Sequence, residues 1–125
     1  MRQIHTAQSA PQAIGPYSHA VSFGGVLYCS GQLALHPESG EMVGNDAAVQ
    51  ARQSLENLAA VCEAAGTSLA RALRLGVYVV DLESFAQVND VYGEFFTREP
   101  PARVLVEVAG LPRGGLVEID ALVAI

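Results

Sequence analysis

The stretch from residue 46 to residue 65 reads DAAVQARQSLENLAAVCEAA and has the clearest periodicity in the chain. Its apolar residues recur at steps of three and four, which places them on one face of a helix that packs against a core. Gly66 follows at the position where a left-handed residue commonly closes a helix. We therefore predict a helix over residues 46–65 whose buried stripe comprises Ala48, Ala51, Leu55, Leu58, Cys62 and Ala65.

Strand patterns flank this helix on both sides. Gly24-Gly25 separates two apolar runs, residues 20–23 and 26–29, and thus predicts a β-hairpin. The elements expected after the helix are a strand over residues 73–80, a second helix over residues 84–96, and strands over residues 102–108 and 116–125 joined by a turn at residues 111–115. This order predicts an α+β fold in which one mixed β-sheet carries two helices packed on one face.

Composition narrows the classes of protein to which the chain can belong. Its 125 residues fit one domain, residues 1–125. The formal net charge is −6, from 13 acidic and 7 basic residues, and lysine is absent, so a nucleic-acid partner is not expected. No stretch reaches the ~20 apolar residues of a membrane span, and the start of the chain lacks the layout of a signal peptide. We therefore expect a cytoplasmic protein without a membrane partner.

Cysteine and histidine residues give no sign of a metal site. Cys29 and Cys62 are far apart and match no metal-binding or redox spacing. His5, His19 and His36 are scattered, and none pairs with a cysteine or an aspartate at a ligand spacing. We therefore expect two buried free thiols and no metal ion.

Alternation along the last two strands predicts what each face of the sheet contacts. In each strand one set of alternate residues is entirely apolar, and we expect these sets to face the helices. The other sets mix leucines with an arginine and several carboxylates, as on a face covered by a partner subunit, although a hydrated face with scattered leucines fits the same pattern. The set expected toward the helices is Val104, Val106, Val108, Val117, Ile119, Ala121 and Val123, and the mixed set is Arg103, Leu105, Glu107, Leu116, Glu118, Asp120 and Leu122.

Arg103 and Glu118 are the strongest candidates for chemistry. By this alternation they lie on neighbouring strands and point the same way, so they could flank one small substrate that carries a carboxylate. A guanidinium can clamp a carboxylate with two hydrogen bonds, and a glutamate can hold or deprotonate a water molecule. A cross-strand pair of this kind is, however, more often a surface salt bridge worth ~0–1 kcal/mol. The pattern alone does not decide between a catalytic pair and a surface salt bridge. It also does not show whether a functional role belongs to Tyr17, Ser30, Gly31 and Asn89.

Several short motifs occur in a fixed order along nearly the whole chain. They are IGPYSHAV at residues 14–21, SGQ at residues 30–32, QARQSLENL at residues 50–58, VYVVDLESFAQV at residues 77–88, PAR at residues 101–103, LP at residues 111–112 and EIDA at residues 118–121. Together these segments resemble the RidA (YjgF) family of reactive-intermediate deaminases. Because separate motifs agree in order, the resemblance is specific for the family and its fold.

The resemblance implies a chorismate-mutase-like subunit, a homotrimer, and active sites in clefts between subunits. The implied reaction is the cofactor-free hydrolysis of enamines or imines such as 2-aminoacrylate and 2-iminopropanoate, which yields a 2-keto acid and ammonia. By position, Arg103 matches the arginine that binds the substrate carboxylate, and Glu118 matches the glutamate that orients the attacking water. The backbone of Leu105 falls where the family contacts the substrate nitrogen, and the positions that line the pocket are Tyr17, Ser30, Gly31 and Asn89.

The sequence departs from the family pattern near the arginine. Val104 replaces a small hydroxyl residue, Leu105 stands where many members have cysteine, and residues 96–100 look shorter. These differences change the polarity and the rim of the pocket, so the substrate stays open. Two other functions also stay open: an endoribonuclease-type hydrolase, which the net charge of −6 disfavours, and a non-catalytic trimeric module that binds small acids or a partner protein.

Overall fold

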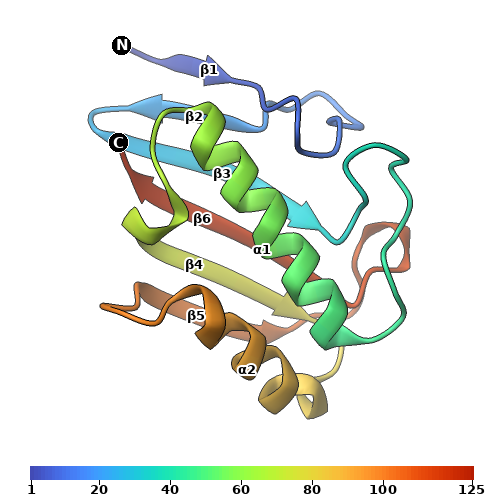
Figure 1. Cartoon of the computed structure of the whole chain (residues 1–125). Coiled ribbons are helices and arrows are strands. Elements are labelled where there is room, and N and C mark those ends of the chain that lie inside the picture. Colours follow the sequence, from blue (N-terminus) through green and yellow to red (C-terminus); the bar gives the residue numbers. More distant parts are fainter.

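One six-stranded sheet forms the frame of the molecule. The computed structural model describes residues 1–125. The strands are arranged in the order β1-β2-β3-β6-β4-β5 (Figure 1). Neighbouring strands are antiparallel except for β4 and β5, which run parallel. The bounds are β1 (Gln3–His5), β2 (Ala20–Phe23), β3 (Val26–Leu33), β4 (Ala72–Val79), β5 (Ala102–Glu107) and β6 (Val117–Ala124).

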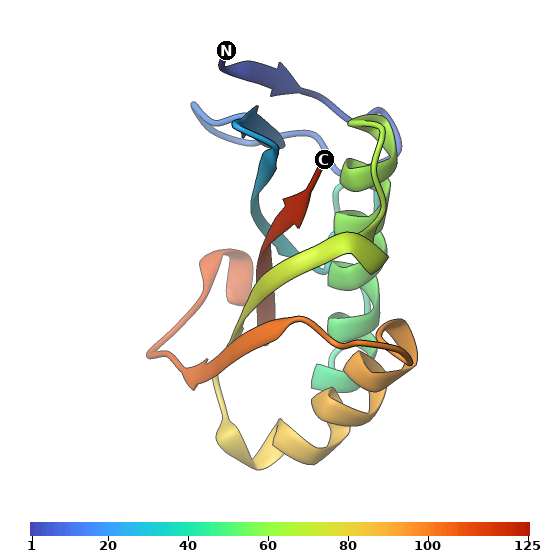
Figure 2. The same ribbon diagram turned by 90° about the vertical axis from the view of Figure 1, so that its left-hand side faces the viewer.

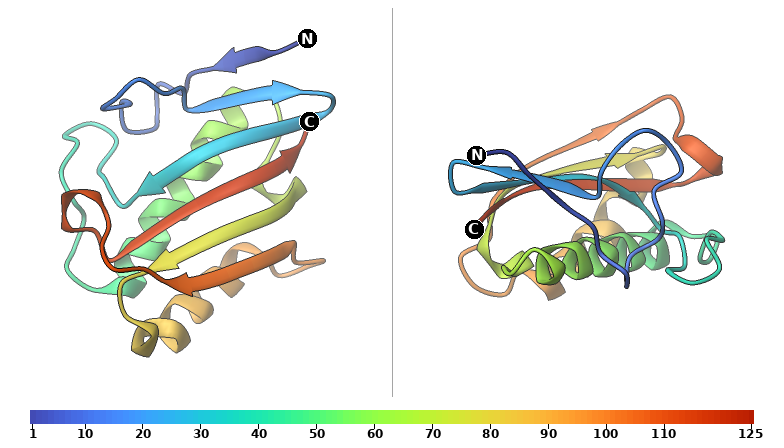
Figure 3. Two further views of the ribbon diagram at one scale, coloured as in Figure 1. Left: turned by 180° about the vertical axis from the view of Figure 1, so that it is seen from behind. Right: turned by 90° about the horizontal axis from the view of Figure 1, so that it is seen from above.

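Two helices, α1 (Ala47–Ala64) and α2 (Phe85–Phe95), cover the same face of the sheet (Figure 2). The opposite face, called the open face below, carries neither helix (Figure 3). The predicted mixed sheet with two helices on one face is therefore confirmed. No helix combines the length and the apolar composition needed to cross a lipid bilayer. Three short 3₁₀ turns precede β4, α2 and β6, namely η1 (Leu69–Arg71), η2 (Leu82–Ser84) and η3 (Pro112–Gly114).

Local signals place the ends of α1 and the first hairpin as predicted. The Asp46 carboxylate accepts a hydrogen bond from the backbone N–H of Val49 at 2.9 Å, which satisfies a free donor at the start of α1. Gly66 has φ +88°, the left-handed conformation that commonly ends a helix. Gly24 and Gly25 have φ +60° and +82°, as a tight hairpin between β2 and β3 requires.

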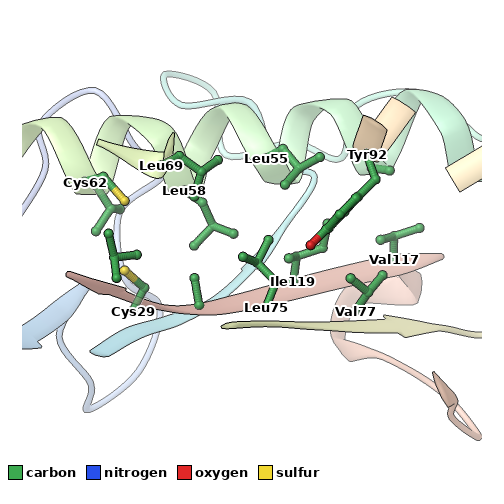
Figure 4. Packing of buried hydrophobic residues seen from close by; sticks show 14 of the residues in the cluster. Cys29, Leu55, Leu58, Cys62, Leu69, Leu75, Val77, Tyr92, Val117 and Ile119 are labelled. Carbon is green, nitrogen blue, oxygen red and sulfur yellow. The ribbon is translucent and has the colours of Figure 1, made fainter. Parts of the chain in front are cut away.

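The core lies between the helices and the sheet. Leu55 and Leu58 of α1 are fully buried opposite Leu75 of β4 and Ile119 of β6 (Figure 4). Burying such a side chain contributes ~1.5–3 kcal/mol relative to leaving it in water. Alternate residues of β6 all belong to this core, as predicted, so the intervening residues, including Glu118, point to the open face.

Strand β5 occupies a place that we did not predict. We expected β5 and β6 to be neighbours joined by a turn, but β4 lies between them. The chain leaves β4, forms α2 and returns as β5 parallel to β4, so β5 becomes an edge strand. The last strand then fits between β3 and β4 and is antiparallel to both. Strands that follow each other in sequence are usually neighbours, and this parallel crossover unit is the reason for the exception here.

The orientation of β5 also differs from the prediction. Arg103 pairs with Leu75, which is fully buried in the core, so Arg103 and Leu105 face the helices. Val104 and Val106 lie instead on the open face. The apolar residues of β5 do not identify its buried face, because an edge strand is covered incompletely. Val106, for example, is 40% exposed. Arg103 and Glu118 consequently point to opposite sides of the sheet.

Candidate active site

A pocket of about 340 Å³ lies beside Glu118, where β3 and β6 meet the N-terminal segment. We call it the Glu118 pocket. Tyr17, Ser30 and Gly31 line it together with Glu118, so the structure brings these four predicted site residues together. The remaining lining residues are Pro11, Gln12, Ile14, Gln32, Leu33, Leu35 and Pro112.

A β-bulge places Ser30 and Gly31 in this pocket. The pairing of β3 with β6 shifts its register between Cys29 and Gln32, so the two residues between them leave the ladder. The Ser30 hydroxyl donates a hydrogen bond to the carbonyl of Ser18 at 2.6 Å, which holds the bulge against the preceding loop. Bulges of this kind re-aim side chains and are common beside functional sites.

Gly31 allows the Glu118 carboxyl group to lie against the backbone of the bulge. A Cβ atom at residue 31 would lie 2.8 Å from Oε2 and 3.1 Å from Cδ of Glu118. Gly31 does not have a positive φ, so the close approach is what requires glycine here. Any larger residue would push the carboxyl group out of its present place.

A buried histidine holds the N-terminal wall of the Glu118 pocket. His19 Nδ1 accepts a hydrogen bond from the N–H of Ala7 at 2.9 Å, and Nε2 donates one to the carbonyl of Pro11 at 2.8 Å. The acceptor role of Nδ1 assigns the proton to Nε2. Tyr17 enters the pocket from a tight turn in which its N–H donates to the carbonyl of Gly15 at 2.8 Å. His19 therefore ties the wall segment to the sheet.

Asn57 of α1 holds the wall at the end of β3. Asn57 is 1% exposed, and its Nδ2 donates to the carbonyls of Leu33 and Leu35 at 3.1 and 3.0 Å. The side-chain amide of Gln53 donates to Asn57 Oδ1 at 2.9 Å and orients it. Both leucines line the pocket, so a helix residue sets the position of this wall.

The Glu118 carboxyl group is half-buried and has no cationic partner in the chain. The ion pair of the structure joins Arg52 to Glu94 on the surface. Burial raises the pKa of Glu118, and the negative charge of Asp120 raises it further. A carboxylate in such surroundings is a stronger base toward water than a fully hydrated one.

A second pocket, of about 480 Å³, lies beside Arg103 between α2 and β5, and we call it the Arg103 pocket. Arg103 Nη1 donates to Asn89 Oδ1 at 2.9 Å, and Arg103 Cζ lies 4.7 Å from the centroid of the Tyr92 ring. Burial raises the pKa of Tyr92, so the ring is an uncharged platform for the guanidinium. Asn89 takes one of five N–H donors, which leaves others for a carboxylate. The pocket is completed by Gly93, Phe96, Pro100 and Pro101.

The two pockets lie on different sides of the sheet within one chain. Arg103 faces the helices on the edge strand β5, whereas Glu118 faces the open side on β6, and β4 separates the two strands. The prediction that these two residues share one face of neighbouring strands is therefore wrong. Leu105 shares the face of Arg103, and the outer edge of its strand has no neighbouring strand in this chain.

Comparisons with known proteins define the family. A family model described as endoribonuclease L-PSP matches residues 7–125. The fold is similar to the crystal structure of a Rid-family protein from Yersinia pestis, with a TM-score of 0.97, 40% identity and coverage of 100% of both chains. The chain belongs to the RidA (YjgF) family.

Relatives within the RidA family carry different names. A protein from Bos taurus named 2-iminobutanoate/2-iminopropanoate deaminase is 42% identical over 122 residues, which cover 98% of this chain and 89% of that protein. A RutC family protein from Pyrococcus horikoshii is 44% identical over 122 residues, covering 98% of this chain and 97% of that protein. Membership of the RidA family therefore leaves the substrate to be decided by the site itself.

The sequence identified part of the lining of the Glu118 pocket and missed the rest. Ile14 and Pro112 line the Glu118 pocket and lie within motifs that carried the resemblance, so the sequence held a signal for both. Gln12 lines the same pocket but lies outside every quoted motif.

No three His, Cys, Asp or Glu side chains gather anywhere in the chain in an arrangement that could hold a metal ion.

Proposed function

We propose that this RidA-family chain hydrolyses enamines and imines derived from amino acids, such as 2-aminoacrylate and 2-iminopropanoate, to 2-keto acids and ammonia. We further propose that it works as a homotrimer in which each active site lies between two subunits. The observation that carries the proposal is the division of the polar residues into two pockets, one with an oriented guanidinium and one with an unpaired carboxyl group. The relative named as a 2-iminobutanoate/2-iminopropanoate deaminase supports the reaction class.

Arg103 is suited to bind the carboxylate of an imino acid. Asn89 holds one side of the guanidinium at 2.9 Å, and the Tyr92 ring supports its face, so the donor fork is oriented before a substrate arrives. Each hydrogen bond to a charged group in a shielded site contributes ~1.5–3 kcal/mol. Preorganisation lowers the entropy lost on binding.

Glu118 is suited to act first as a base and then as an acid. Its carboxylate takes a proton from water, the water oxygen bonds to the imine carbon, and the electron pair of the C=N π bond moves to nitrogen. The substrate reacts as its protonated imine, so the nitrogen is then a neutral amino group. Glu118 passes the proton that it took from water to this nitrogen, the C–N bond breaks, and ammonia leaves with the bonding electron pair. The hydroxyl proton passes to the Glu118 carboxylate or to water as the carbonyl forms. Proton transfers of this kind contribute ~10²–10⁴-fold to the rate.

Assembly of the site from two subunits accounts for the geometry of one chain. A molecule as small as an imino acid cannot contact Arg103 and Glu118 from opposite sides of a sheet with β4 between them. A neighbouring copy that presents its Arg103 pocket to the Glu118 pocket would complete the site. Apolar residues on the open face, including Tyr28 at 49% and Val106 at 40% exposed, support its coverage by another copy.

Mixing two inactive variants tests both parts of the proposal. We expect Arg103→Ala and Glu118→Gln each to lose imine hydrolysis, whereas Arg71→Ala, which removes an exposed guanidinium that lines neither pocket, keeps it. In a randomly mixed cyclic trimer of the two inactive variants, each mixed trimer regains one complete site, so about one quarter of wild-type activity should return. A mixture that stays inactive would contradict a shared site. Full activity in either single variant would contradict the catalytic assignment.

The same variants also distinguish imine hydrolysis from two other functions. The description of the family model makes RNA a second candidate substrate, although the net charge of −6 opposes it. RNA cleavage by the wild-type protein that is lost in Arg103→Ala would favour a nuclease. Binding of 2-keto or 2-amino acids without any imine hydrolysis would favour a non-catalytic binding module.

A further inference from the structure

A second carboxylate lies beside Glu118 and is held in place by two donors. Asp120 is two residues further along β6, so both side chains point to the open face with Cα atoms roughly 6.5–7 Å apart. Asp120 Oδ1 accepts a hydrogen bond from the backbone N–H of Gly76 at 3.0 Å, and Oδ2 accepts one from the Tyr78 hydroxyl at 3.2 Å. The carboxylate is the acceptor in both contacts, as its charged form requires.

Gly76 makes room for this arrangement. It lies directly opposite Asp120 in the ladder between β4 and β6. A Cβ atom at residue 76 would lie 2.5 Å from Asp120 Oδ1 and 2.7 Å from the Tyr78 hydroxyl oxygen. Glycine therefore lets the carboxylate and the phenol close over the backbone of β4. We call these three residues the Asp120 clamp.

The clamp places a second negative charge on the same face of the sheet as Glu118. Tyr78 lies directly opposite Glu118 in the same ladder, so the clamp borders Glu118 on the side of β4. The structure contains no ion pair that involves either carboxylate. Outside the core, the titratable and charged groups on the elements around Glu118 are Asp120 of β6, Tyr78 and Arg74 of β4, Tyr28 of β3, Tyr17 of the N-terminal segment and Arg113 of η3.

We propose that Asp120 is a positioning residue whose fixed negative charge strengthens Glu118 as the base of the reaction. This inference rests on the proposed hydrolase function and adds a residue to it. Two carboxylates on one face repel each other, and the repulsion is stronger in a half-buried site than in water. Because two donors support the charge on Asp120, Glu118 is the member of the pair that takes the proton. Unequal surroundings divide acid and base roles between paired carboxylates in this way.

The electrostatics of the neighbouring groups agree with this assignment. Burial raises the pKa of Glu118, and the charge of Asp120 is the second cause. The pKa of Tyr78 is raised by burial and then by Asp120, so its hydroxyl keeps its proton and remains a donor to the clamp at neutral pH. A base whose pKa lies closer to the working pH transfers protons more effectively.

The test removes the charge of Asp120 and follows the protonation of Glu118 directly. In Asp120→Asn an amide oxygen can still accept the hydrogen bond from Gly76, but the negative charge is lost. Carbon-13 NMR of glutamate carboxyl groups, with Glu118 assigned by the signal missing in Glu118→Gln, measures the pKa in the full-length protein without substrate. We expect the pKa of Glu118 to fall in Asp120→Asn and to fall equally in Asp120→Ala. The alanine variant replaces the asparagine variant in this measurement if the latter does not fold. Glu56→Gln, which removes an exposed charge from α1, should leave it unchanged.

The pH profile of imine hydrolysis is the second readout. The acidic limb of kcat/KM should move to lower pH in Asp120→Asn, because the base loses its proton more easily. An unchanged Glu118 pKa in both Asp120 variants would overturn the proposal. So would an equal fall in Tyr78→Phe, which removes the hydroxyl that donates to Asp120 but keeps the negative charge. A lowered pKa in a protein that hydrolyses no imine would instead uphold the role of Asp120 and reject the hydrolase function.

Discussion

Replacing Gly31 by alanine would put a methyl group where the Glu118 carboxyl group now lies. The added Cβ would be 2.8 Å from Oε2, 3.1 Å from Cδ and 3.2 Å from Cγ of Glu118. Carbon atoms in optimal contact are ~3.5–4.0 Å apart, so the carboxyl group has to move by roughly 0.5–1 Å. The Glu118 side chain is half-buried and can rotate away, so we expect the fold to survive.

A displacement of this size affects catalysis far more than stability. Misplacing a reacting group by ~1 Å can reduce the rate ~10²-fold. We therefore expect kcat to fall ~10²-fold in Gly31→Ala, with KM little changed because Arg103 is untouched. At a residue without a positive φ, the change from glycine to alanine stabilises a protein by up to ~1 kcal/mol through the unfolded state, so Tm should not fall.

Imines generated by an amino-acid oxidase, with kcat and KM measured alongside Tm, check this prediction. Gly110→Ala is the matched control, since a Cβ there meets no atom within 4 Å and φ is not positive. Wild-type kcat in Gly31→Ala would refute the reasoning. Adding Gly31→Ala to Glu118→Gln should not lower the residual activity of Glu118→Gln if the effect passes through Glu118. A further loss in the double variant would show that Gly31 acts by another route.

Two further predictions concern stability. Because its folded-state pKa is raised, ionised Glu118 destabilises the folded state above the unfolded pKa of ~4.3, so Glu118→Gln should raise the free energy of unfolding at pH 8. That gain should vanish below about pH 4, and a gain that persists in acid would contradict it. Asn57→Ala should lower the free energy of unfolding by ~1–3 kcal/mol for each of the carbonyls of Leu33 and Leu35 that it leaves unpaired. Urea denaturation measures both, and a loss under about 0.5 kcal/mol in Asn57→Ala would show that water replaces the amide.

Local patterns predicted the elements whose partners are close in sequence or whose burial is complete. Helix α1 follows from its apolar spacing and from the glycine, Gly66, that comes after it, and both signals lie within one short segment of the chain. The inward face of β6 follows from an unbroken alternation, because its inward residues are all at most 3% exposed. These features need no knowledge of the tertiary fold.

The relation between Arg103 and Glu118 could not be predicted in this way. Motifs located each residue, but their separation depends on β6 entering the sheet between β3 and β4, which no local pattern encodes. The face of β5 was also hidden, since both of its alternating sets contain apolar residues. A register shift of one residue moves every side chain of a strand to the other face of the sheet. When both alternating sets contain apolar residues, the sequence therefore does not show which set faces the helices.

The supports of the Glu118 pocket were hidden for another reason. His19 bonds to backbone groups 12 and 8 residues away, and Asn57 reaches carbonyls 24 and 22 residues away. Side-chain bonds to a distant backbone leave no periodic trace in a sequence. Both residues look like isolated polar residues until the fold brings their partners to them.

The placement of β6 affects how the protein can be made. The last of the six strands along the sequence takes a central position in the sheet. It joins two halves, β1-β2-β3 and β4-β5, that have no ladder between them without it. A nascent chain on the ribosome therefore cannot complete its sheet until Val117–Ala124 have left the exit tunnel. The same eight residues carry Glu118 and Asp120, so an interrupted translation product would lack these two carboxyl groups as well as its fold.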